Sequence, residues 1–172
     1  MRYHSFSNIS SEAVFSICGK FRYWLSREWG LESPFGVFLL MNPSNADPLR
    51  LDLTTMICTN LAVHWGWRGF GIVNLDPGIN STPKNPASLS TDVLNENDYW
   101  INSAHNLADY FVLAVGNNNH SKMIKEIRRL KLSEPFHAID KKGKGGGYPH
   151  PRKFLDINRF PKEPIQLLTP LL

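Results

Sequence analysis

The chain has 172 residues, of which 42% are hydrophobic and 20% are charged. The length suits one domain, and the composition is that of a globular protein, which excludes a disordered or fibrous chain. Nineteen Lys and Arg residues against 15 Asp and Glu residues give a net charge of +4, compatible with a polyanionic partner. The N-terminus has no apolar core like that of a signal peptide, and no apolar run approaches the ~20 residues that span a bilayer. We therefore expect a cytoplasmic protein without membrane attachment.

A hydrophobic period of two runs along residues 14–29. The apolar side chains of Phe21, Tyr23 and Leu25 alternate there with Arg22, Trp24 and Ser26. Such alternation is typical of a half-buried strand, and Gly19-Lys20 makes a suitable turn. We predict a β-hairpin over this segment.

Four later segments are short and continuously apolar, at residues 36–41, 70–73, 110–115 and 136–139. Strands without alternation are buried on both faces, as in a parallel sheet covered by helices. We expect one helix capped by Asp52, one beginning at Asn95 and one over residues 121–130, with a long loop over residues 76–94. The side chains expected on their buried stripes are Leu53, Met56, Ile57, Leu61 and His64, then Trp100, Ile101, Ala104, Leu107 and Ala108, then Ile124, Ile127 and Leu130. The basic residues of the third helix are expected to form a solvated face.

This order of elements predicts a single α/β domain over residues 1–172. We expect a three-layer α/β/α sandwich with a central, mostly parallel four-stranded sheet. The hairpin would occupy residues 14–29, the core residues 36–155, and a surface tail residues 156–172.

Polar residues follow the predicted strands, where ligands bind in open α/β sheets. They are Asn42-Pro43-Ser44, Asn74, Gly116 with three asparagines, and Tyr148-Pro149-His150-Pro151. Asparagine both donates and accepts hydrogen bonds, which suits the edge of a planar base, and histidine can stabilise developing negative charge. Individually these residues could equally be turn and cap residues.

The segment before His150 is basic and rich in glycine, with Lys141, Lys142 and Lys144 ahead of Tyr148. Lysines on such a backbone can approach phosphates closely, although a plain connector would have the same composition. The two cysteines, Cys18 and Cys58, lie in apolar segments and are expected to be buried, reduced thiols. With no clustered histidines, they predict neither a metal site nor another cofactor.

At several positions the chain resembles one prokaryotic and phage family, known only as domain of unknown function sixteen forty-three. The resemblance covers roughly residues 14–155. It rests on Arg22-Tyr23, Leu25, Arg27, Trp29, Met41-Asn42-Pro43-Ser44, Ala46-Asp47, Asp52, Thr54, Asn74-Leu75 and the Pro-His-Pro.

More distantly, the layout is similar to the uracil-DNA glycosylase superfamily, which has a three-layer α/β fold. Asn42-Pro43, Asn74 and His150-Pro151 stand in the order of that superfamily's water-positioning, base-reading and His-Pro motifs. The chain departs from it after His150-Pro151, where Arg152-Lys153 replaces the usual continuation. It also lacks the four-cysteine cluster of one branch and a stacking aromatic after the first motif.

This resemblance implies a glycosylase-like enzyme that hydrolyses the N-glycosidic bond of a flipped base, normal or modified, in DNA, with no obligate protein partner. Catalytic roles are expected for Asn42, Asp47, Asp52 and His150, and base contacts for Asn74, Ser44 and Tyr148. Phosphate contacts are expected for Lys141, Lys142, Lys144, Arg152 and Lys153. Two alternatives remain open: a non-catalytic nucleic-acid-binding module, and an enzyme acting on free nucleotides.

Overall fold

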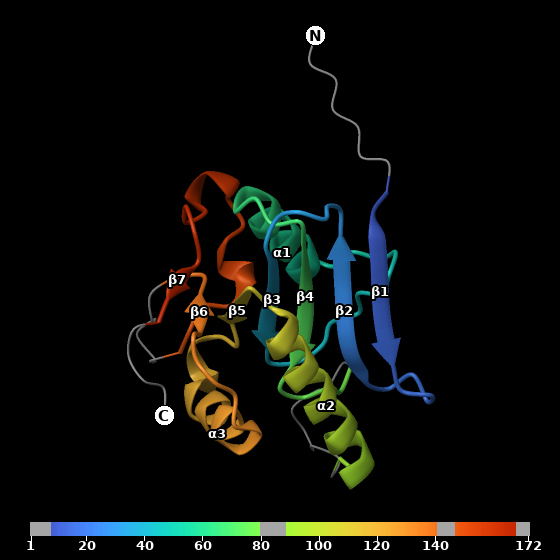
Figure 1. Ribbon diagram of the computed structural model, residues 1–172. Coiled ribbons are helices and arrows are strands. Elements are labelled where there is room, and N and C mark those ends of the chain that lie inside the picture. Colours follow the sequence, from blue (N-terminus) through green and yellow to red (C-terminus); the bar gives the residue numbers. More distant parts are fainter. Residues whose placement is uncertain (1–7, 80–88, 141–146, 168–172) are drawn as a thin grey trace.

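A computed structural model describes residues 8–79, 89–140 and 147–167 (Figure 1). Its strands are β1 (Ser10–Phe15), β2 (Arg22–Glu28), β3 (Phe35–Leu40), β4 (Gly69–Asn74), β5 (Tyr110–Leu113), β6 (His137–Ala138) and β7 (Ile165–Gln166). Its helices are α1 (Leu53–His64), α2 (Thr91–Leu107) and α3 (His120–Leu130), with 3-10 turns at Asn117–Asn119, Pro151–Lys153 and Ile157–Arg159. The α/β class expected from the sequence is confirmed.

The strands form one mixed seven-stranded sheet in the order β1-β2-β4-β3-β5-β6-β7. β3 pairs in parallel with β4 and with β5, and β5 pairs in parallel with β6 through Val112 and His137. β1, β2 and β7 run antiparallel to the strands they adjoin. The parallel pairs therefore occupy the middle of the sheet.

The sheet is larger than the expected four strands. The hairpin begins at Ser10 instead of residue 14, and it is not a separate unit because β2 pairs with β4. The segment expected to be a surface tail supplies β7, which pairs with β6. β7 has only two residues, too few to leave a recognisable period in the sequence.

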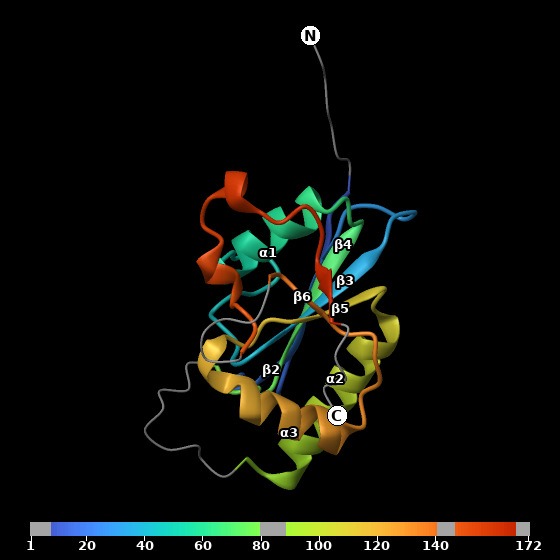
Figure 2. The ribbon, with the colours of Figure 1, turned by 90° about the vertical axis from the view of Figure 1, so that its left-hand side faces the viewer.

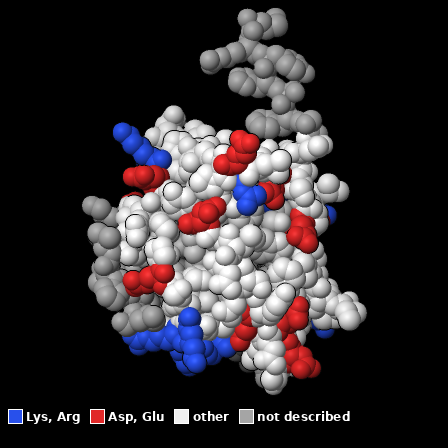
Figure 3. Space-filling model, viewed as in Figure 1, with Lys and Arg blue, Asp and Glu red and all other residues white. Residues whose placement is uncertain are grey.

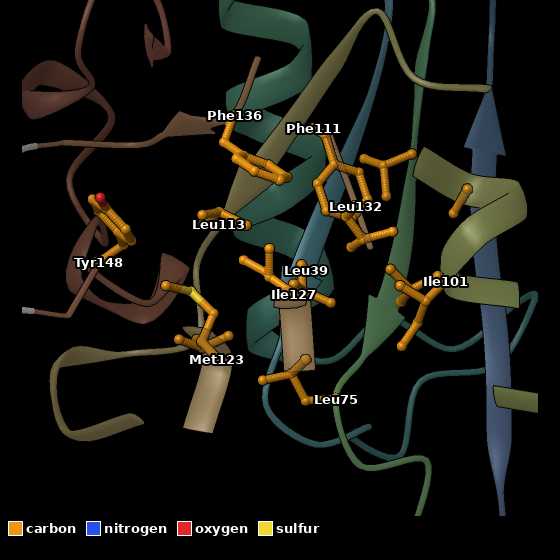
Figure 4. Packing of buried hydrophobic residues seen from close by; sticks show 14 of the residues in the cluster. Leu39, Leu75, Ile101, Phe111, Leu113, Met123, Ile127, Leu132, Phe136 and Tyr148 are labelled. Atoms are coloured by element: carbon orange, nitrogen blue, oxygen red, sulfur yellow. The ribbon is translucent and has the colours of Figure 1, made fainter. Parts of the chain in front are cut away.

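Helices cover both faces of the sheet (Figure 2), with α1 on one side and α2 and α3 on the other. Successive residues of β3 therefore enter different cores: Phe38 and Leu40 pack with α1, whereas Val37 and Leu39 pack toward α2 and α3. Figure 4 shows the second core from close by. Its labelled members include Leu39, Leu113, Ile101, Met123 and Ile127. Burial on both faces explains why these strands are apolar at every position.

The first helix begins as expected, because the Asp52 carboxylate accepts a hydrogen bond from the Thr55 backbone N–H at 2.7 Å. Its buried stripe is rotated from the expected one, since Leu53, Met56 and His64 are exposed. The buried side chains are Thr54, Thr55, Ile57, Cys58, Leu61 and Ala62. Polar and small residues take part of the buried face, so hydrophobicity alone gave the wrong orientation.

The second helix starts earlier than expected, and Asn95 lies inside it. The N-cap is Ser90, whose hydroxyl accepts from the Val93 backbone N–H, so α2 takes residues 91–94 from the expected loop. Ile101 and Ala104 are buried, but Leu107 is exposed at the end of the helix. In α3 the buried residues are Met123 and Ile127, while Ile124 and Leu130 are only partly buried.

One cysteine differs from expectation. Cys58 is buried in α1, as expected, but Cys18 is exposed in the turn between β1 and β2. The apolar neighbours of Cys18 in sequence do not cover it, because Ile17 is itself fully exposed.

Candidate functional site

A cavity of about 450 Å³ opens where the loop after β3 meets the start of α1 and the Pro-His-Pro segment. Its lining residues are Met41, Asn42, Pro43, Ser44, Asn45, Asp52, Thr54, His150 and Arg152. Its volume falls within the range of small-molecule sites. A hollow of similar size beneath Trp29 and Trp67 is mostly apolar and has Arg68 as its one charged side chain, so it offers little chemistry. Five predicted site residues thus line one cavity: Asn42, Ser44, Asp52, His150 and Arg152.

His150 is held in its neutral form. Burial, followed by the positive charge of Arg152, lowers its pKa to about 4, against a weaker opposite effect of Asp52. Its Nδ1 accepts a hydrogen bond from the Arg152 backbone N–H at 3.2 Å. Because Nδ1 accepts, the proton of the neutral ring is on Nε2. His150 is therefore a neutral hydrogen-bond donor at the cavity.

Asp52 lines the same cavity as an anion. Burial raises the pKa of its carboxyl, but hydrogen bonding from the Ser44 side chain and the Thr55 backbone, together with the Arg22 charge, outweighs burial and leaves the pKa below its ordinary value. One of its oxygens caps α1 through Thr55. A carboxylate fixed in this way can orient a water molecule or stabilise a cation.

A fully buried arginine supports the loop from behind. Arg22, in β2, is 1% exposed and donates from Nη1 to the Ala46 carbonyl at 3.0 Å and, more weakly, to the Ser44 carbonyl at 3.4 Å. Burial lowers its pKa to about 10, so it stays charged at neutral pH. The guanidinium fork therefore ties the loop carrying Asn42 and Ser44 to the sheet.

Asn74 belongs to this buried network and does not line the cavity. Its Oδ1 lies 3.5 Å from Arg22 Nη2, and its backbone carbonyl accepts from Asn97 Nδ2 at 3.1 Å. Only 1% of Asn74 is exposed. In this arrangement Asn74 supports Arg22 from the adjacent strand.

The other candidate residues lie around the cavity. Asp47 is engaged in its own turn, where its Oδ1 accepts from the backbone N–H groups of Leu49 and Arg50. Tyr148 is 2% exposed and packs against His120, with ring centroids 6.1 Å apart. Lys153 is exposed beside Arg152. The expected phosphate ligands Lys141, Lys142 and Lys144 lie outside the described residues.

Sequence reasoning gave no role to three residues of this site. Thr54 accepts a hydrogen bond from Arg152 Nε at 3.0 Å and so joins the α1 terminus to the Pro-His-Pro segment. Asn45 contributes an exposed amide to the lining, and Arg22 holds the loop. The sequence signal for a role of Arg22 and Thr54 was that both are among the residues that carry the family resemblance.

Within residues 8–79, 89–140 and 147–167, no group of three or more His, Cys, Asp or Glu side chains could hold a metal ion. In the same part of the chain, no helix is long and apolar enough to cross a membrane.

Comparison with known proteins places the chain in one family. No curated protein and no solved structure matches it significantly. The family described as Protein of unknown function (DUF1643) matches residues 22–152, which include every residue that lines the cavity. Because the match covers well over half of the 172 residues, the chain belongs to the DUF1643 family of proteins of unknown function.

Proposed function

We propose that this protein is a hydrolase that cleaves the N-glycosidic bond of a nucleotide extruded from DNA. One observation carries the proposal: a neutral His150 and an ionised Asp52 line the same cavity of about 450 Å³. Cleavage of a glycosidic bond needs a donor for the departing base and a negative charge near the sugar. The cavity provides both.

In the proposed reaction the C1′–N bond breaks, and its electron pair leaves with the base. His150 Nε2–H donates a hydrogen bond to the base as negative charge collects on it. The Asp52 carboxylate stabilises the cationic sugar and accepts a proton from the attacking water, whose oxygen bonds to C1′. The base leaves as an anion and takes a proton from solvent, and Asp52 returns its proton to solvent, so the overall reaction consumes one water molecule.

A neutral histidine suits this step better than a cationic one. A buried cation would bind any anion in the ground state, whereas a neutral donor gains most as the base becomes anionic. Desolvation, the first cause of the low pKa of His150, also strengthens its hydrogen bond to a charged acceptor. Asp52 is favoured over Asp47 as the water-activating group because Asp47 does not line the cavity.

Recognition of the base is assigned to the loop after β3. Asn42 and Asn45 bring side-chain amides to the cavity lining, and Ser44 adds a hydroxyl. These groups can both donate to and accept from a base edge. Exposed Arg152 and Lys153, next to His150, would contact the flanking phosphates. The His-Pro segment then acts as in the uracil-DNA glycosylase-like arrangement, whereas the Asn-Pro segment reads the base in place of Asn74 and Asp52 takes over the water.

The test is incubation with a panel of normal and modified DNAs, followed by alkali to reveal abasic sites. We expect wild-type protein to produce abasic sites in one of these DNAs. His150→Ala should lower the rate by about 100- to 1,000-fold, as loss of a preorganised donor does elsewhere, with DNA affinity nearly unchanged. Asp52→Asn should also lower the rate while still capping α1, because asparagine is an equally good N-cap residue.

The matched control is His64→Ala, since His64 is exposed at the far end of α1. Its activity should equal that of wild type. DNA binding without abasic sites in any DNA of the panel would indicate a binding module and contradict the proposal. Release of base from free nucleotides alone would assign the cavity to the small-molecule alternative.

A further inference from the structure

The outer face of α3 is strongly basic. Lys122, Lys125 and Arg128 are exposed along it, while Met123 and Ile127 on the opposite face are buried. In the space-filling view (Figure 3), Lys and Arg atoms gather over α3, and acidic residues lie over the neighbouring α2. On the face shown in Figure 3, the positive charge is therefore concentrated mainly over α3.

A fourth basic residue of α3 is used differently. Arg129 forms a two-pronged ion pair with Asp98 of α2, at 2.5 and 2.6 Å, and a further bond from Nε to Glu126 at 2.7 Å. Among the described residues, the salt bridges involve Arg68, Arg129 and Arg159, and none involves Lys122, Lys125 or Arg128. The outward cations thus lack a carboxylate partner within that part of the chain, while Arg129 joins the two helices.

The basic face is also hollowed. A depression of about 420 Å³ is lined by His120, Ser121, Ile124, Lys125 and Arg128. Two cations and a hydroxyl around a concave surface match the donors that bind phosphate oxygens. A uniformly convex lysine face would have no such place for a phosphate group.

α3 begins beside the candidate active site. A Cβ added at Gly116 would lie 3.8 Å from His150 Cβ and 3.9 Å from Asn119 Nδ2, so these three residues adjoin one another. The Gly116 backbone N–H also donates to the Tyr148 carbonyl at 2.9 Å. With 11 residues, α3 extends about 16 Å from this point, roughly the length of five base pairs.

We propose that the outer face of α3 is a phosphate-binding surface that holds the nucleic-acid backbone flanking the nucleotide in the cavity. The inference rests on the proposed function for the identity of the polyanion, and it assigns to Lys122, Lys125 and Arg128 a role that the sequence did not suggest. Contacts of this kind position the nucleic acid without reading its sequence.

The test measures binding of fluorescein-labelled 20-nucleotide single-stranded and duplex DNA by anisotropy at several salt concentrations. The variant is Lys122→Gln, Lys125→Gln and Arg128→Gln together. The matched control replaces Lys20, Arg159 and Lys162, which are exposed residues on other elements, by Gln for the same change of −3 in net charge. We expect the α3 variant to bind at least 10-fold more weakly at 0.1 M salt. Its slope of log affinity against log salt should be smaller by about one per cation removed.

The control should keep the wild-type slope. Equal weakening in the two triple variants would overturn the inference, because it would show a general effect of net charge. Binding of wild-type protein to phosphatidylserine vesicles but not to DNA would overturn it as well. The glycosidase proposal has a separate readout: abasic sites that depend on His150 with an unchanged α3 salt slope would leave it standing. A changed salt slope in the α3 variant, without abasic sites in any DNA of the panel, would support the phosphate-binding surface and contradict the glycosidase proposal.

Discussion

His150 takes its protonation state from its surroundings. Its backbone position after Pro149 brings the ring against Arg152 and into a partly buried place at the cavity, and burial is the largest cause of its lowered pKa. The same neighbours fix the tautomer through the Arg152 N–H. The sequence suggested His150 as a hydrogen-bond donor, and the fold holds it in the neutral form that donates from Nε2.

This state has a consequence for stability. The pKa of His150 is about 4 in the folded protein and near 6.5 in an unfolded chain. Between these values the unfolded chain binds a proton that the folded protein does not, so the free energy of unfolding falls as pH drops from 6.5 toward 4. The effect of this one group is about 2–3 kcal/mol. Urea denaturation at pH 7 and pH 5 should show a smaller loss of stability in His150→Gln than in wild type.

The slope of the free energy of unfolding against pH should not fall to zero in that variant, because burial also lowers the pKa of His137. His64→Gln, at an exposed position, serves as the control and should keep the wild-type slope. A His150→Gln slope equal to wild type would mean that His150 is already charged in the folded protein.

Arg22 shows why part of the site could not be predicted. Alternation with Phe21 and Tyr23 suggested a strand with one solvated face, yet Arg22, Tyr23, Trp24 and Leu25 are all buried. β2 is covered on both sides, so its polar position points inward and finds carbonyl acceptors in a distant loop. By contrast, Asn42, Asp52 and His150 were predictable, because strand ends and helix starts meet at one edge in this fold class.

At the level of elements, tryptophans pack over glycines in the two central strands. A Cβ at Gly36 of β3 would overlap the Trp67 ring, and one at Gly71 of β4 would overlap Trp24. Trp67 also stacks on Tyr110, with ring centroids 5.4 Å apart. These contacts require glycine at positions where strands otherwise favour larger residues.

Gly36→Ala should therefore destabilise the protein by about 2–3 kcal/mol, as overpacking of a close-packed core does. The measurement is urea denaturation of the four proteins of a double-mutant cycle: wild type, Gly36→Ala, Trp67→Leu and the double variant. Trp67→Leu removes the overlapping ring, so the alanine should cost less in that background. Additive effects of the two substitutions would contradict the packing argument.

The sequence predicted the start of a helix correctly only where a single residue was the evident N-cap. Asp52 was the evident cap before α1, and it is the cap. Before α2 both Ser90 and Asn95 are good cap residues, and apolar spacing favoured the second. The helix starts at the first because the Ser90 hydroxyl can accept from the Val93 backbone N–H, which adds residues 91–94 to the helix.

At the scale of the molecule, the middle strands of the sheet are the most deeply buried. All six residues of β3 are buried, and the strand has a partner on each side. β1, at one edge, pairs with β2 alone and has no fully buried residue. The sequence indicated the central strands by their continuous apolar runs and the β1–β2 hairpin by its alternation, but it gave little sign of the two-residue β7 at the other edge.

Amide hydrogen exchange should follow this gradient. The Phe38 and Leu39 amides should exchange only through global unfolding, whereas β1 amides should exchange by local opening. Low concentrations of urea should accelerate exchange in β3 with the slope of global unfolding and leave exchange in β1 nearly unchanged. Equal protection of β1 and β3 would contradict the gradient. Since Asn42 and Ser44 follow directly from β3 and Arg22 ties their loop to β2, the cavity loop should open less often than the exposed β1–β2 turn, which keeps Asn42 and Ser44 in place.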